Sequence, residues 1–311
     1  MDETARIALI ARILAAKVEG VEVGIGDDAA VLRARAGVER MVWTIDEQVE
    51  GVHFRRELAS WRDVGWRSFE AAASDVAAMG ARPWCALSAL VLPESVDDAA
   101  LEEITCGQRD AAAAVGAPIV GGNLSRGSSF SIATTLLGVC ERAVTRSGAQ
   151  PGDVLWMAGQ VGLAACGLRA IEGGRADEPR LRRAVAAWRR PEALVSHGRA
   201  MAHSARAAVD VSDGLARDVG HLAEASGVQA VIEASALLSD AALVEAAMAL
   251  GVDPLDLALH GGEDYSLVAA SPVPLDGFRR IGEIRAGAGL VLRGERGDSC
   301  LSARGFDHFA K

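Results

Sequence analysis

Acidic side chains recur beside glycines and short apolar runs throughout this 311-residue sequence. They stand at Asp27, Asp28, Asp46, Glu47, Asp75, Asp210, Asp213, Glu263 and Asp264. A single acidic turn carries little information, because turns favour Asp for local backbone hydrogen bonds. Recurrence is more informative: a fold that brings several carboxylates together forms a site for a hard cation such as Mg²⁺, which prefers oxygen ligands. The turn at Asp27-Asp28 is the first element of this predicted site.

The elements that carry these carboxylates are predicted from apolar periodicity and from helix breakers. Asp46 ends a strand that begins at Met41, and Asp75 lies inside a helix from Trp61 to Met79. A carboxylate in that alanine-rich helix must be paired or reach solvent, since an isolated buried charge is too costly. The first half also predicts a helix over 4–17, a strand over 83–93, a helix over 95–115 that opens with a capping box at Ser95 and Asp98, a loop over 121–127 and a strand over 130–139.

The glycine pair that opens the 121–127 loop is followed by Arg126. Glycines let a backbone approach phosphate oxygens closely, and an arginine can then pair with their charge. Glycine-rich turns between strands are common, so this motif is weak when taken alone.

The second half follows a turn-rich linker over 145–153, where we place the boundary between an N-terminal domain (1–147) and a C-terminal domain (148–311). Its predicted elements are a strand over 154–158, helices within 162–203, a strand over 207–211, a helix over 214–225, a strand over 228–233, a helix over 241–250 and strands near Ile281 and Leu290. Both halves mix strands with helices, which predicts α/β domains of two layers each.

Composition excludes several classes of protein. The net charge of −10 opposes nucleic-acid binding, which needs a basic surface to displace counterions. The longest apolar stretches, such as 85–92, are far shorter than the ~20 residues of a membrane span. The first residues are acidic where a secretory signal would be basic. We therefore expect no nucleic-acid or membrane partner and a cytoplasmic location.

Lysine is almost absent: Lys17 and Lys311 are the two in the sequence. Neither lies in a phosphate-binding loop or a kinase-type strand, which excludes ordinary P-loop and protein-kinase architectures, and neither fits a buried Schiff-base lysine. The five cysteines form no C-x-x-C pair and are expected to be reduced thiols. The tryptophans are expected in the core rather than in an aromatic binding box; they are Trp43, Trp61, Trp66, Trp84, Trp156 and Trp188.

Eight motifs occur in one order along the chain. They are G-I-G-D-D-A-A, D-x-x-V-E-G-V-H-F, S-D-V-A-A-M-G-A-x-P, G-G-N-x-x-R-G, T-R-S-G-A-x-P-G-D, D-V-S-D-G-L-x-x-D, G-G-E-D-Y and G-F-D-H-F. With them the chain resembles the thiamine-monophosphate kinase family, within the superfamily of aminoimidazole ribonucleotide synthetase and selenophosphate synthetase. The likeness runs nearly end to end.

The resemblance implies an α/β (α+β) fold of two mixed domains, with the N-terminal sheets paired in a homodimer. It implies ATP-dependent phosphorylation of thiamine monophosphate to thiamine diphosphate, with several Mg²⁺ ions between the domains. The implied metal ligands are Asp28, Thr44, Ile45, Asp46, Asp75, Asn123, Asp210 and Asp213. The implied ATP contacts are Gly121, Gly122, Arg146 and Ser212, and the implied substrate contacts are His53, Glu263 and Phe306.

The implied chemistry agrees with the residues. Phosphoryl transfer needs positioning and charge neutralisation, which dispersed aspartates and Mg²⁺ supply. The acceptor is a phosphate monoester with a second pKa of about 6, so it is largely ionised near neutrality and no general base is required. Clustered metals can then replace the missing lysine as counter-charge.

Three positions depart from the family pattern. Asn123 stands where the family has Asp, Ile45 stands where it has a second Thr and can offer only its carbonyl oxygen, and Leu163 follows Gly162 where it has Asp. An Asn oxygen ligates Mg²⁺ without charge, which predicts weaker binding at that position. Two alternatives to an active kinase therefore stay open: a weakened paralogue that binds thiamine phosphate or nucleotide, and a sibling ATP-dependent enzyme with another acceptor.

Overall fold

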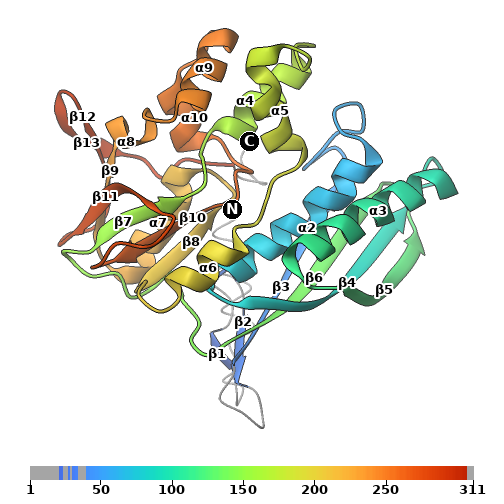
Figure 1. Cartoon of the computed structure of the whole chain (residues 1–311), viewed down its shortest axis with the longest axis horizontal. Coiled ribbons are helices and arrows are strands. Elements are labelled where there is room, and N and C mark those ends of the chain that lie inside the picture. The colour runs from blue at the N-terminus through green and yellow to red at the C-terminus, as the bar shows by residue number, and fades with distance from the viewer. Residues whose placement is uncertain (1–20, 24–26, 29, 34–39, 307–311) are drawn as a thin grey trace.

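The structure is a computed structural model that describes residues 21–23, 27–28, 30–33 and 40–306. Two sheets, each covered by helices, are joined by the irregular segment 141–153 (Figure 1). The helix expected over 4–17 and the end of the G-F-D-H-F motif lie outside the described residues.

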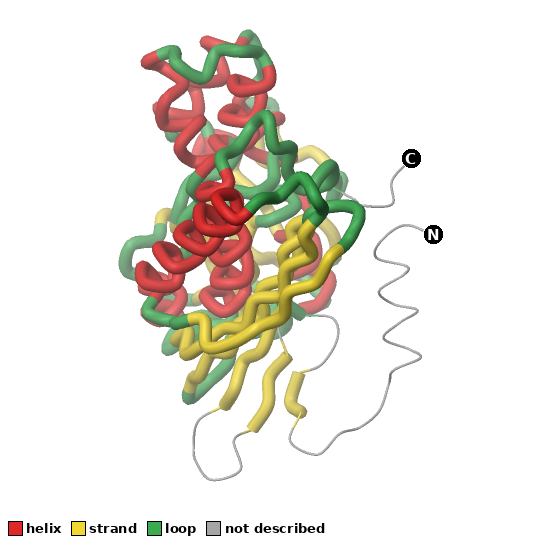
Figure 2. Tube along the Cα trace, turned by 90° about the vertical axis from the view of Figure 1, so that its right-hand side faces the viewer, coloured by secondary structure: helices red, strands yellow, loops and turns green. Residues whose placement is uncertain are grey.

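The first sheet has six strands in the order β1-β2-β3-β6-β4-β5. The strands are β1 (Val21–Val23), β2 (Ala30–Arg33), β3 (Arg40–Val49), β4 (Arg82–Leu92), β5 (Ile119–Arg126) and β6 (Ser131–Cys140). All neighbours are antiparallel except β4 and β5. Helices α2 (Trp61–Ala78) and α3 (Asp98–Val115) lie on one side of the strands, as the turned view in Figure 2 shows.

Strand β3 shows why only one face of this sheet is covered. Val42, Thr44 and Gln48 are buried, whereas Trp43 and Ile45 between them are 50% and 68% exposed. Side chains alternate between the faces of a strand, so the exposed set points away from the helices. The prediction that Trp43 and Trp84 belong to the core is wrong, because both are half exposed.

Two local predictions in the first half are also wrong. The predicted loop over 121–127 is strand β5 as far as Arg126, because the extended backbone there pairs with β4 from Ala86 to Leu92. The cap of α3 is Asp97 rather than Ser95: its side chain accepts a hydrogen bond of 2.8 Å from the Ala100 N–H. Asp is as good an N-cap as Ser, and the capping position is fixed by where the helix begins.

The second sheet has seven strands in the order β13-β12-β9-β11-β7-β10-β8. They are β7 (Val154–Ala158), β8 (Ala207–Val211), β9 (Gln229–Glu233), β10 (Ser266–Ser271), β11 (Arg279–Arg285), β12 (Gly289–Gly294) and β13 (Gly297–Leu301). The helices are α4 (Leu163–Glu172), α5 (Arg182–Arg189), α6 (Val195–Met201), α7 (Leu215–Ser226), α8 (Ala234–Leu237), α9 (Ala241–Leu250) and α10 (Pro254–His260), with a 3-10 turn, η1 (Pro179–Leu181). One large apolar core lies between these helices and the sheet.

Helix α2 belongs to both halves of the molecule. It packs on β3 and β6 of the first sheet and on β8 and β10 of the second. Its small residues Ala77 and Ala78 join Met201, Leu267 and Ala269 in a buried cluster between the sheets.

Among the described residues, no helix combines the length and the apolarity that a membrane crossing requires.

Candidate functional site

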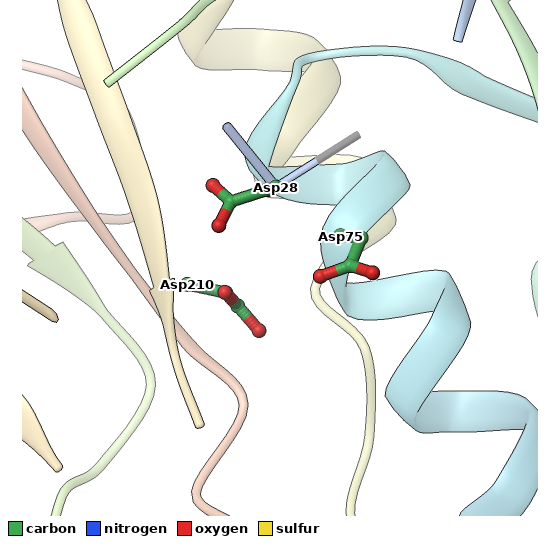
Figure 3. Close-up of side chains that lie close together, drawn as sticks. All are labelled: Asp28, Asp75 and Asp210. Carbon is green, nitrogen blue, oxygen red and sulfur yellow. The ribbon is translucent and has the colours of Figure 1, made fainter. Parts of the chain in front are cut away.

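Three carboxylates from distant parts of the chain converge between the two halves of the molecule. Asp28 precedes β2, Asp75 lies on α2 and Asp210 lies on β8, and one oxygen from each is within 4.8 Å of the others. Figure 3 shows the three side chains turned toward a common space. We call these residues the acidic cluster. The predicted convergence of Asp28, Asp75 and Asp210 is thus observed in the structure.

Local packing explains how these charges are held. Asp210 is the fourth residue of β8, all five of whose residues are buried, and Asp75 follows Ser74 in the buried part of α2. Thr44 on β3 donates a hydrogen bond of 2.6 Å to Asp75. Ser74 donates one of 2.8 Å to Asp210. The hydroxyl donors stabilise the charged form of both carboxylates.

Arg146 supplies a positive charge to the acidic cluster. Its guanidinium forms an ion pair with Asp28, and its backbone N–H donates to Asp27 Oδ2 at 3.1 Å. The other Asp28 oxygen, Oδ2, is buried and has no hydrogen-bond partner within the described part of the chain. A buried carboxylate oxygen of this kind is costly unless a cation or donor completes it.

The pKa values of the acidic cluster reflect the same shortage of positive charge. Burial raises the pKa of Asp28 to about 7, and the charges of Asp210 and Asp27 add to the shift against the opposing Arg146. Burial also raises the pKa of Asp210 to about 6 and that of Asp75 well above its usual range. Carboxylates so crowded call for a bound cation, which would return them to the ionised form.

Asp46 and Asp213 lie close enough to act on this site through their charge. Burial raises the pKa of Asp46 to about 6, and the charges of Glu263 and Asp213 contribute. Beside burial, the charges of Asp213 and Asp46 both raise the pKa of Asp210. Both predicted ligands therefore act electrostatically on the acidic cluster.

The turn after β8 is held by Asp218, which is not among the predicted ligands. Asp218 on α7 accepts hydrogen bonds of 3.1 Å from the backbone N–H groups of Ser212, Asp213 and Gly214. Its place as the last Asp of the D-V-S-D-G-L-x-x-D motif was the available signal. Asp218 thereby orients the turn that carries Ser212 and Asp213.

Three predicted substrate contacts surround this turn or follow β3. Glu263 donates its backbone N–H to the Ser212 carbonyl at 2.7 Å, and Phe306 donates its own to the Asp213 carbonyl at 3.0 Å. The Phe306 ring is 46% exposed. His53, just after β3, accepts a hydrogen bond of 3.0 Å from the Val49 N–H through Nδ1.

The structure does not bring Gly121, Gly122 and Asn123 to the acidic cluster. They lie on β5, and Gly122 is in register with Asp46 through Ser88 and Thr134. Three strand spacings separate β3 from β5, which is about 14 Å. The glycines and Asn123 instead line a groove of about 910 Å³ beside α3. The side chain of Ile45 points to the exposed face.

Both halves of the chain match domains of known protein families. Residues 26–140 match the family described as AIR synthase related protein, N-terminal domain, and residues 150–289 match its C-terminal domain. The fold and the site thus define a two-domain AIR synthase related protein.

Individual proteins similar to this chain identify the family more narrowly. The chain is 40% identical over 278 residues to thiamine-monophosphate kinase of Mycobacterium tuberculosis, covering 88% of this chain and 82% of the relative. It is 32% identical over 314 residues to that of Aquifex aeolicus, covering 99% and 98%. A solved structure of AaThiL complexed with AMPPCP and TMP superimposes with a TM-score of 0.91 at 32% identity, covering 99% of this chain and 97% of the other. The chain belongs to the thiamine-monophosphate kinase family.

Proposed function

We propose that this protein transfers the γ-phosphoryl group of ATP to the phosphate of thiamine monophosphate, giving thiamine diphosphate and ADP. The acidic cluster carries this proposal: Asp28, Asp75 and Asp210 come from both halves of the molecule and leave a buried oxygen of Asp28 for a cation. A site of this kind suits phosphoryl transfer, in which positioning and charge neutralisation dominate. The likeness to thiamine-monophosphate kinases supports the choice of acceptor.

Magnesium fits the donor set, because hard Mg²⁺ prefers oxygen ligands and the acidic cluster offers carboxylate oxygens alone. The residues that would hold it are Asp28, Asp75 and Asp210, with Thr44, Asp46 and Asp213 around them. When bound, Mg²⁺ would neutralise and orient the phosphate oxygens of donor and acceptor. Ile45 could join only through its carbonyl oxygen.

The chain's own residues would bind and orient the two substrates. Arg146, which pairs with Asp28, would exchange that partner for a phosphate of ATP. Ser212 is the second proposed ATP contact, in the turn fixed by Asp218. Glu263, Phe306 and His53 are the proposed contacts of the acceptor. The acceptor phosphate is largely ionised near neutrality, so its oxygen can attack without a general base.

We take residues 1–147 as the N-terminal domain and 148–311 as the C-terminal domain. A homodimer would account for two features of the N-terminal domain. Trp43, Ile45, Trp84 and Leu87 expose apolar surface on one sheet, and a partner's sheet would cover it. Pairing of two such sheets would also offer Gly121, Gly122 and Asn123 a route to a nucleotide bound by the partner. We place the reaction in the cytoplasm, where ATP is supplied.

The departure at Asn123 leaves the three carboxylates of the acidic cluster unchanged. Asn123 lies on β5, and in a paired dimer it would reach the partner's nucleotide without the charge of an Asp. A weakened protein that binds thiamine phosphate or nucleotide is therefore the alternative to an active kinase. Product identification would distinguish this kinase from a sibling ATP-dependent enzyme with another acceptor.

The test is product identification with purified protein, ATP and thiamine monophosphate over a Mg²⁺ titration. The proposal expects thiamine diphosphate and ADP in equal amounts, and none when a chelator removes the metal. ADP release that requires a different phosphate acceptor would favour the sibling enzyme. Binding of both ligands without any product would favour the weakened paralogue.

A further inference from the structure

Glu263 is held in an unusual backbone conformation beside the acidic cluster. The φ angle of Glu263 is 64° and that of Tyr265 is 49°. Both lie in the left-handed region, which residues other than glycine rarely adopt. Such a conformation is strained, so surrounding contacts must enforce it. The Ser212 and Val211 carbonyls do so by accepting the N–H groups of Glu263 and Tyr265 at 2.7 and 2.8 Å.

Both carboxylate oxygens of Glu263 are also fixed. Oε1 forms an ion pair with the guanidinium of Arg67, and Oε2 accepts a hydrogen bond of 3.0 Å from Trp188 Nε1. Arg67 comes from α2 and Trp188 from α5, so the two donors reach Glu263 from opposite halves of the molecule. Four constraints, two on the backbone and two on the side chain, thus set the direction of this carboxylate.

Arg67 and Trp188 form a single support. The guanidinium carbon of Arg67 lies 4.6 Å from the centroid of the Trp188 ring, and Arg67 also donates to the Trp188 carbonyl oxygen. The Arg67 side chain is 1% exposed and Trp188 is equally buried, whereas the Glu263 side chain is 27% exposed. The support is therefore internal, whereas the Glu263 side chain that it holds is partly exposed.

We infer that Arg67 and Trp188 are positioning residues for recognition of the acceptor, an inference that rests on the proposed function. An ionised carboxylate accepts hydrogen bonds but donates none, and each Glu263 oxygen keeps a lone pair after its bond to Arg67 or Trp188. Fixed in this way, Glu263 presents an oriented negative charge to a ligand that carries a cation and N–H donors. Thiamine monophosphate has both, in its thiazolium ring and its amino group.

A purely structural role is the rival explanation, because α2 makes other bonds to the same part of the second half. Trp66 Nε1 on α2 donates to the Pro191 carbonyl at 2.6 Å, which joins the two halves without touching Glu263. Trp66 is therefore the matched control for Trp188. Both replacements by Phe keep an aromatic ring and remove one N–H donor between elements.

Steady-state kinetics with each substrate varied separates the two explanations. Trp188→Phe should raise KM for thiamine monophosphate about tenfold, since hydrogen bonds to charged groups are the strong ones, with kcat and KM for ATP changed less than about twofold. Trp66→Phe should leave KM for thiamine monophosphate within about twofold of wild type. Equal changes in the two variants, or no change in Trp188→Phe, would overturn the inference.

Arg67 is tested by a conservative variant, because removal of its buried charge could prevent folding. Arg67→Lys keeps the charge but not the planar fork that holds Oε1 and the Trp188 carbonyl together. It should raise KM for thiamine monophosphate and leave KM for ATP unchanged. An Arg67→Lys enzyme with wild-type KM for both substrates would remove Arg67 from the positioning role.

Calorimetric titration of thiamine monophosphate into metal-loaded protein separates this inference from the proposed reaction. If wild type forms no thiamine diphosphate but binds thiamine monophosphate, and Trp188→Phe alone weakens that binding about tenfold, the reaction is wrong and the positioning role stands. If Trp188→Phe binds as tightly as wild type, the positioning role is wrong whatever the activity. If wild type does not bind thiamine monophosphate, both fail.

Discussion

Ser74 on α2 donates a hydrogen bond of 2.8 Å to Asp210 on β8, and this bond joins the two halves of the molecule at the acidic cluster. The hydroxyl opposes the burial that raises the pKa of Asp210. Because a metal ligand must be ionised to bind, the hydroxyl should strengthen metal binding as well as domain contact.

Ser74→Ala should therefore weaken both metal binding and the contact between the two halves of the molecule. We expect a loss of about 1 kcal/mol in the free energy of unfolding and a rise of about fivefold in the Mg²⁺ concentration for half-maximal activity. Ser68→Ala is the control, since Ser68 is buried on the same helix and donates to the Gly65 carbonyl, away from Asp210. An unchanged Mg²⁺ titration in Ser74→Ala would contradict a role in the site.

Asp75→Asn should separate stability from activity. Burial, together with the charges of Asp210 and Asp28, raises the pKa of Asp75, so replacing this carboxyl with an amide should make the metal-free protein melt about 2–4 °C higher. Turnover should fall by about 100-fold or more because a metal ligand is lost. Differential scanning calorimetry with and without Mg²⁺, beside a kinetic assay, measures both.

His203→Ala is the control for Asp75→Asn, because His203 is exposed and lies after α6. It should keep wild-type turnover and wild-type stabilisation by Mg²⁺. Similar losses in the two variants would remove Asp75 from the proposed site.

Glu70 makes stability depend on pH. Burial raises the pKa of its carboxyl to about 8 from 4.5, although the Ala193 N–H donates to it at 2.6 Å. The unfolded chain therefore releases this proton at lower pH than the folded protein, and the contribution of Glu70 to stability falls as pH rises from about 4.5 to 8. Glu70→Gln should remove that fall, a difference on the order of 1–3 kcal/mol at pH 8.

Urea unfolding of wild type and Glu70→Gln at pH 5 and pH 8 measures this effect. Glu102→Gln on the exposed side of α3 is the control and should follow the wild-type slope. If Glu70→Gln loses as much stability as wild type between the two pH values, another group is responsible.

The exposed face of the first sheet predicts the oligomeric state. Light scattering should give the wild-type protein twice the mass of one chain. Leu87→Glu, on a face where Trp43 and Ile45 are also exposed, should shift the protein to monomers because a buried unpaired carboxylate opposes pairing. Met248→Glu on α9, at a position 74% exposed, is the control and should stay dimeric. A monomeric wild type would contradict the homodimer.

Much of the fold could be predicted from local signals, because strands such as β7 and β8 are short apolar runs and α9 has the bounds expected for it, 241–250. The face that a strand buries is less predictable: Trp43 looked like a core residue because alternation does not say which side is covered. Gly121-Gly122 looked like a loop because glycine disfavours strands, but pairing with β4 overrides that preference.

The acidic cluster was predictable because each of its carboxylates lies in a distinctive motif. The contacts that hold Glu263 were not predictable: Arg67 and Glu263 are 196 residues apart, and nothing near either residue indicates the other. Trp188 was expected in the core and is buried there, yet its indole N–H reaches Glu263. Contacts of this kind depend on tertiary packing rather than on local pattern.

Isotope transfer can follow the γ-phosphoryl group from ATP to thiamine monophosphate. The donor would be ATP whose three non-bridging γ-phosphoryl oxygens are ¹⁸O, with Mg²⁺ and thiamine monophosphate, and mass spectrometry would follow the products. We expect thiamine diphosphate with all three labels on its terminal phosphate and unlabelled ADP. Labelled inorganic phosphate beside unchanged thiamine monophosphate would contradict it.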